Sequence, residues 1–184
     1  MLQKVARFLL VVAFCLFPAT MQAAPISVTP GETITVILDA PSDFSIPRYY
    51  ETMQYEFKKK FPTANLIIGT KAQDTYYSYW MDRGFLEPQK MTQTKELFDL
   101  AAYCKTNKTI VLLVTESIMD DDSDEYRANI RMRAFAVTPN NILTPVQTSR
   151  DDHSRASNLR AKKGAFDTCL NDVLKEIAPP KEKK

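Results

Sequence analysis

The chain has 184 residues, of which 45% are hydrophobic and 25% charged, a balance that is ordinary for a globular protein and excludes a polytopic membrane protein. Its length fits one domain. Removing residues 1–23, a predicted leader, leaves 22 of the 24 Lys+Arg against all 22 Asp+Glu, so the net charge is zero and gives no reason to expect nucleic acid or an anionic membrane as a partner.

The N-terminus has the layout of a secretory signal peptide. Lys4 and Arg7 precede an apolar run over residues 8–17, Pro18 ends the run, and Ala23 is followed by a second alanine. The run is too short for a membrane span, which needs about 20 residues. We therefore expect cleavage after Ala23, no transmembrane helix in the mature chain, and a periplasmic or secreted protein.

The first half of the mature chain predicts a strand, a helix and a strand. Residues 33–39 (TITVILD) form the first strand, and residues 64–70 (ANLIIGT) form the second. Between them, apolar side chains recur at helical spacing at Tyr50, Met53, Phe57 and Phe61. This order within about 40 residues is typical of a parallel crossover unit.

Residues 71–115 predict two more helices and the central strand. Asp74 can cap a short helix, and Gly84 suits the left-handed residue after its end. Pro88 permits a new helix start, and the inward stripe of that second helix comprises Leu97, Leu100, Ala101 and Cys104. Residues 109–115 (TIVLLVT) are apolar on both sides, so this strand must be covered on both faces.

The remaining chain predicts a hairpin and a last helix. Residues 128–137 alternate between apolar and polar, with Arg131 and Arg133 on the wet side, and residues 142–148 form the returning strand. Residues 151–158 form a polar loop, and residues 159–177 form the last helix.

These elements define an α/β fold class. We expect one three-layer-like domain over residues 24–178, followed by a lysine-rich tail over residues 179–184. Its mixed sheet has about five strands, three parallel plus an antiparallel hairpin, in the order β-α-β-(α)-α-β-β-β-α.

This order resembles a family of small periplasmic α/β domains. The resemblance is carried by residues 33–39, the helix through Tyr50 and Phe57, residues 110–114 after the helix through Leu100, the hairpin over 128–148, and the last helix through Phe166. Such domains occur in the curli-secretion channel subunit, the lipoprotein activators of penicillin-binding proteins, and the N-terminal domain of TolB. The resemblance implies a binding or assembly role, although the chain has no pair of membrane-spanning hairpins like the curli channel.

The sequence contains no motif typical of nucleotide or metal binding. The mature-chain glycines are isolated, which excludes a phosphate-cradling loop, so we expect no nucleotide and no cofactor. Asp120, Asp122 and Asp124 start a calcium-loop pattern, but it fails at Glu125, where glycine is needed, and at Arg131, where glutamate is needed. We therefore expect no metal site and name no catalytic residue.

His153 is the only histidine and lies in the sequence Asp151-Asp152-His153. With the two aspartates it could bind a metal or act as a base. The alternative is an exposed loop histidine, because one histidine without further ligands makes a poor zinc site.

An aromatic cluster lies in the short predicted helix. Tyrosine and tryptophan are enriched at recognition surfaces, which makes these residues the candidate binding site. The alternative is that the helix packs on the sheet edge and buries most of the rings. The cluster comprises Tyr76, Tyr77, Tyr79 and Trp80.

The cysteines leave two alternatives. Cys15 follows Phe14, where a lipid-attachment site needs a small residue, so a lipid anchor is not expected. Cys104 and Cys169 form an even pair in an exported chain and could make a disulfide if their helices lie on one face of the sheet. On opposite faces they are buried hydrophobes.

The sequence therefore predicts an exported, non-catalytic cell-envelope protein that serves as a protein-binding or assembly module with an envelope protein as its partner. The alternative is a small exported hydrolase or a metal-dependent enzyme that uses His153. The oligomeric state has no signal in the sequence.

Overall fold

The computed structural model describes residues 25–41, 44, 46–91, 93–118, 125–138, 140 and 143–178. In this part of the chain the strands are β1 (Thr33–Asp39), β2 (Asn65–Ile67), β3 (Lys108–Ile118), β4 (Tyr126–Val137) and β5 (Leu143–Ser154). The helices are η2 (Ile46–Tyr49), α2 (Tyr50–Lys60), α3 (Thr70–Met81), α4 (Thr94–Cys104) and α5 (Asn158–Ile177).

The strands form one mixed sheet in the order β2-β1-β3-β4-β5. β2 and β3 pair in parallel with β1 on its two sides, while β4 and β5 continue the sheet as an antiparallel hairpin. The predicted fold class is confirmed, including the three parallel strands, the hairpin and the chain order. The predicted central strand is β3, in the middle of the sheet.

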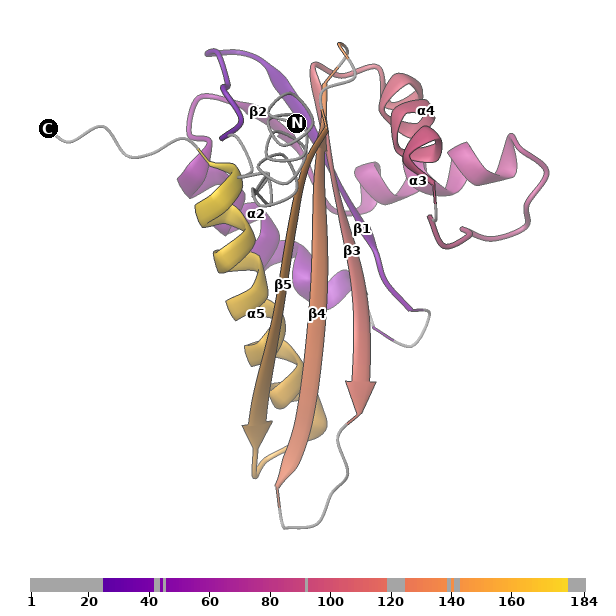
Figure 1. The fold of residues 1–184 in the computed structure, drawn as a ribbon. Coiled ribbons are helices and arrows are strands. Elements are labelled where there is room, and N and C mark those ends of the chain that lie inside the picture. The colour runs from indigo at the N-terminus through magenta and orange to yellow at the C-terminus, as the bar shows by residue number, and fades with distance from the viewer. Residues whose placement is uncertain are drawn as a thin grey trace, which may run out of the picture.

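Helices cover both faces of the sheet, which gives three layers (Figure 1). On one face, α2 and α5 bury a core that includes Phe57, Phe166 and the even-numbered apolar residues of β3. On the other face, α3 and α4 bury a smaller core around Val111, with Trp80 and Leu100. The alternating side chains of β3 thus enter two separate cores, as a strand with period two requires.

Local interactions fix the helix starts. At α4, Gln93 and Glu96 form a reciprocal capping box, and at α5 the Ser157 side chain accepts a hydrogen bond from the Arg160 N–H. The predicted start of α3 at Asp74 is wrong, because α3 begins at Thr70. Gly69, at φ 84°, turns the chain beside the Tyr50 ring, and a backbone of this shape suits glycine.

The largest departure from the prediction is the length of β5. The predicted polar loop over residues 151–158 is wrong, because β5 continues to Ser154 and pairs residue by residue with the start of β4. The side chains of this segment are polar, so it has no apolar periodicity from which a strand could be predicted. β2 is shorter than predicted and is reduced to Asn65–Ile67.

Within the described residues, no helix combines the length and apolarity that crossing a bilayer requires. The aspartates of the calcium-loop pattern, Asp120, Asp122 and Asp124, lie outside the described residues, as do the predicted leader and the lysine-rich tail.

Replacing Leu112 by aspartate should abolish folding. Leu112 is fully buried, and the substitution places an unpaired carboxylate in the larger core at a cost above about 4 kcal/mol, close to the whole stability of a small domain. Thr115→Asp is the matched control, because this side chain of the same strand is exposed. Circular dichroism with urea unfolding measures both variants, and a stably folded Leu112→Asp protein would contradict the role of β3.

Candidate functional site

The aromatic cluster lies on α3, and most of it faces inward. Tyr76, Tyr79 and Trp80 are at most 3% exposed, whereas Tyr77 is 45% exposed. The structure thus brings three of the four candidate binding residues into the core beneath α3 and leaves Tyr77 at the surface.

The buried rings join α3 to α4. Tyr79 makes edge-to-face contacts with Trp80 and with Tyr103 of α4, with ring centroids 5.1 and 5.7 Å apart. Its hydroxyl donates a hydrogen bond to the Glu96 carbonyl oxygen at 3.2 Å, and the Arg83 guanidinium lies 3.6 Å from its ring centroid. These contacts fix the direction of α3 relative to α4.

The end of α3 is held by a Schellman-type cap. The Gly84 N–H donates to the Met81 carbonyl, and the Phe85 N–H donates to the Trp80 carbonyl at 3.1 Å. Gly84 has φ 86°, the left-handed conformation predicted for it. The Phe85 ring then packs edge-on against Trp80, with centroids 5.4 Å apart, which is the apolar contact that accompanies such caps.

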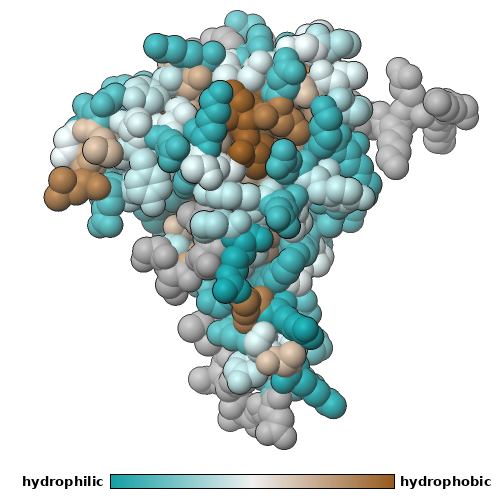
Figure 2. Space-filling view, turned by 180° about the vertical axis from the view of Figure 1, so that it is seen from behind, coloured by the Kyte–Doolittle hydropathy of each residue, from teal (hydrophilic) through white to brown (hydrophobic). Residues whose placement is uncertain are grey.

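This cap presents apolar side chains at the far end of the molecule. α3 points away from the sheet, so its last turn and the loop after it project from the body (Figure 1), and Figure 2 shows hydrophobic surface at that projecting end. We call this surface the α3 tip. It comprises Tyr77 at 45% exposure, Met81 at 62%, Phe85 at 43% and Leu86 at 99%.

Asp39 is a partly buried carboxyl at the end of β1. Burial raises its pKa to about 6, and this rise is opposed by hydrogen bonds from the Tyr76 hydroxyl and the Met91 backbone N–H and by the charge of Lys90. Burial also raises the pKa of Tyr76, which keeps its hydroxyl a neutral donor. Asp39 therefore ties β1 to α3 and to the segment that leads into α4.

His153 lies on β5, opposite Arg127 of β4, and its side chain is exposed. Of the predicted alternative, an exposed loop histidine, the exposure is confirmed and the loop is wrong, because His153 lies in a strand. The Asp152 carboxylate accepts a hydrogen bond from the His153 backbone N–H and not from its ring. In the described part of the chain, no serine or cysteine bonds to the imidazole.

The two cysteines lie on opposite faces of the sheet. Cys169 is buried in the α2–α5 core, whereas Cys104 packs at the edge of the α3–α4 core, and both are free thiols. A disulfide would require α4 and α5 to lie on the same face of the sheet. The predicted possibility of a Cys104–Cys169 bridge is therefore replaced by two separate free thiols. Burial raises the pKa of each thiol to about 11.

Two hollows lie on the described surface. One of about 580 Å³ lies on the outer side of α2, around Tyr55, and one of about 250 Å³ lies between α4 and the end of β4, around Phe98. Among the described residues, no group of three His, Cys, Asp or Glu side chains is placed to hold a metal ion.

The fold and these surfaces define a three-layer α/β domain with a projecting apolar tip. No protein-family model matches the chain, and no curated protein matches its sequence. Solved structures resemble it at low identity. The lipoprotein GNA1162 from Neisseria meningitidis has 10% identity and a TM-score of 0.47, with 78% of this chain and 99% of that chain covered.

Two further structures show the same level of similarity. The LpoB C-terminal domain from Salmonella enterica has 11% identity and a TM-score of 0.41 over 68% of this chain and 87% of its own. PelC from Paraburkholderia phytofirmans, solved as a dodecamer, has 8% identity and a TM-score of 0.42 over 85% and 96%. The predicted resemblance to the penicillin-binding-protein activators is confirmed, and at these identities no residue role is transferred to this chain.

Replacing Asp39 by asparagine should stabilise the protein at neutral pH. The pKa of Asp39 is about 6 in the folded chain and 3.8 in the unfolded chain. The folded state therefore loses stability as Asp39 ionises, and the free energy of unfolding falls as pH rises from about 4 to above 6. Asparagine keeps an oxygen for Tyr76 and Met91 and carries no charge. We expect a gain of up to about 3 kcal/mol at pH 8 that disappears below about pH 4.

Urea unfolding at a series of pH values measures this difference. Asp74→Asn, which alters an exposed carboxyl on α3, is the matched control and should change stability little at any pH. A pH-independent difference for Asp39→Asn would show that its burial is not the cause.

The placement of the cysteines predicts two free thiols in protein purified without reductant. Alkylation should be slow in the native protein, because burial raises both thiol pKa values, and complete at Cys104 and Cys169 after denaturation. Mass spectrometry of the intact protein counts the added groups. A denatured, non-reduced chain that takes up none would contradict their placement on opposite faces.

Proposed function

We propose that the chain is an exported, non-catalytic binding module of the cell envelope that contacts a protein partner through the α3 tip. The observation that carries this proposal is Leu86, which is 99% exposed beside Met81 and Phe85 at the far end of the molecule. A contiguous apolar surface on a projecting element is typical of protein interaction sites.

The cap at the end of α3 does not require the Leu86 side chain. The Schellman-type cap uses the Gly84 and Phe85 backbone and the Phe85 ring, and it makes no use of the Leu86 side chain. Other exposed large hydrophobics stand apart on different elements, namely Tyr55 on α2, Tyr126 on β4 and Leu159 on α5. Scattered residues of this kind are normal, whereas the tip gathers four side chains in the last two turns of α3 and the cap that follows.

The tip is suited to act as an anchor. Its backbone is fixed before binding by the cap and by the contacts of Trp80, so ordering it on association costs little. Full burial of an aliphatic side chain such as Leu86 contributes about 1.5–3 kcal/mol. A partner with an apolar pocket would therefore gain most of its affinity from two or three of these side chains.

The proposed location rests on the sequence of residues 1–23. Its cationic start, apolar run and alanine pair support export and cleavage after Ala23, which leaves the domain over residues 24–178 and the tail over 179–184. The partner is then a protein of the envelope or the exterior.

Site-specific photo-crosslinking tests this function. The full chain carries a photo-reactive amino acid at position 86, or at position 55 as a control, since both side chains are exposed and apolar. In envelope fractions of the source cells we expect one discrete adduct from position 86 and none from position 55, on protein whose N-terminus lies near Ala24.

A second substitution separates binding from chance proximity. Met81→Asp should remove the position 86 adduct because it places a charge in the apolar contact, whereas Tyr55→Asp should leave it unchanged. Equal labelling from positions 55 and 86, or an adduct that survives Met81→Asp, would contradict the role of the tip. An adduct of twice the chain mass from purified protein alone would identify the partner as a second copy.

A further inference from the structure

Part of one sheet face is left uncovered by the described helices. α5 runs along the whole length of β4 and β5 on its side, but α3 and α4 cover only the end of the other face where Val111 and Val137 are buried (Figure 1). Beyond them the same face carries the half-buried Leu113 and the exposed Thr115 of β3. We call the exposed part of β3, β4 and β5 on this side the open face.

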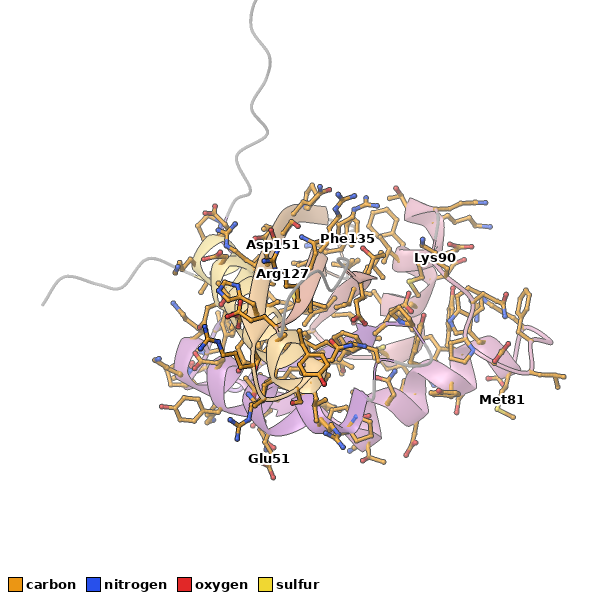
Figure 3. All side chains as sticks on the ribbon, turned by 90° about the horizontal axis from the view of Figure 1, so that it is seen from below. Glu51, Met81, Lys90, Arg127, Phe135 and Asp151 are labelled. Atoms are coloured by element: carbon orange, nitrogen blue, oxygen red, sulfur yellow. The ribbon has the colours of Figure 1, made fainter. Side chains whose placement is uncertain are left out.

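Three arginines of β4 occupy the open face. Arg127, Arg131 and Arg133 are all exposed and alternate with buried residues that enter the α5 core. Their directly opposite partners on β5, which share their side of the sheet, are His153, Ser149 and Gln147. In Figure 3, which looks along the strands, Arg127 and Asp151 lie on the strands, well away from Glu51 on the outer side of α2.

These arginines are not neutralised by ion pairs in the described part of the chain. Arg133 lies over the Phe135 ring at 5.0 Å, which orients its guanidinium along the strand. The carboxylate described among the exposed side chains of this face is Asp151, and it accepts a hydrogen bond from the Asn129 amide. Glu125, directly before β4, is bound by Arg155 at 3.0 Å, and the charge of Arg127 acts on the same carboxylate more weakly.

The cations on the opposite face behave differently. Arg150, on the α5 side of β5, pairs with Asp172, and Lys162 pairs with Glu116. Arg150 and Lys162 are thus each paired with a carboxylate of the same domain. Arg131 and Arg133 have no such role, so their charge is available to a ligand.

The geometry of the open face selects an extended ligand. Side chains on one face of a strand recur about every 6.7 Å, so Arg131 and Arg133 have the spacing of alternate residues in an extended peptide. A guanidinium binds a carboxylate through two parallel hydrogen bonds, and Thr115, Gln147 and Ser149 offer polar groups alongside. A pleated face of this kind is too flat to enclose a small molecule.

We propose that the open face binds an acidic segment of a partner protein, which lies extended along β4 with carboxylates at alternate positions against Arg131 and Arg133 and, further along, Arg127. Charge complementarity and the matching two-residue period support this ligand. The proposal does not depend on the α3 tip, because the two surfaces share no residue.

Two peptides of equal composition test the match of spacing. The probes are a fluorescent eight-residue peptide of alternating Glu and Thr and its block isomer, four Glu followed by four Thr, and fluorescence anisotropy with the full chain measures binding. We expect the alternating peptide to bind about tenfold more tightly than the block isomer, with an affinity that falls as salt rises. Equal affinities would overturn the proposal, because they would show attraction by charge alone.

Matched variants locate the site. R131Q/R133Q should weaken the alternating peptide about tenfold, whereas K71Q/K95Q, which removes two exposed cations from α3 and α4, should not. R131K/R133K keeps the charge but cannot form the bidentate hydrogen bond to a carboxylate, so we expect its loss of affinity to lie between those of the other two variants. This variant also provides a test if R131Q/R133Q does not fold. Equal effects of the α3–α4 pair, or tighter binding of an acidic polysaccharide or single-stranded DNA than of the alternating peptide, would overturn the peptide assignment.

Discussion

Burial of β3 on both faces is the constraint on which the rest of the structure depends. A strand that alternates Ile110 and Leu112 on one side with Val111 on the other cannot leave either side in water. The chain meets this requirement by sending α2 and α5 to one face and α3 and α4 to the other. β1 and β4 then become the flanks of β3, and the short β2 and the polar β5 become the edges.

The two helical layers cover different lengths of their sheet faces. This difference produces both candidate surfaces, the α3 tip and the open face. α5 has 20 residues and follows the hairpin along its length, whereas α3 and α4 have 12 and 11 and pack only where β3 is apolar on their side. α3 is directed off the sheet by the contacts of Tyr79 and Trp80, so its last turn overhangs as an apolar tip. The sheet beneath stays open, and there the residues of β4 turn from Val137 and Phe135 to arginines.

The elements could be predicted from sequence because each has a local cause. Periodicity located β1, β3, β4 and the long helices, and Gly84 marked the end of α3. The last six residues of β5, 149–154, were not predicted as strand because their polar side chains show no apolar periodicity, although the ladder to β4 holds them in a strand. The fate of Cys104 and Cys169 depended on which face each helix covers, a property of the whole chain path that no local pattern contains.

The aromatic helix shows how far residue type alone can lead. Tyr76, Tyr79 and Trp80, with Ala72 one turn earlier, follow the helical spacing of a buried stripe, and Tyr77 falls outside it. The spacing therefore contained the division between core and surface, while the aromatic composition suggested a single binding cluster. Met81, Phe85 and Leu86 were not singled out because an isolated apolar residue in a loop is ordinary. These residues are distinguished by the capped turn that brings them near Tyr77. In the same way, Arg131 and Arg133 differ from the paired cations on the α5 side because no described helix covers their part of β4.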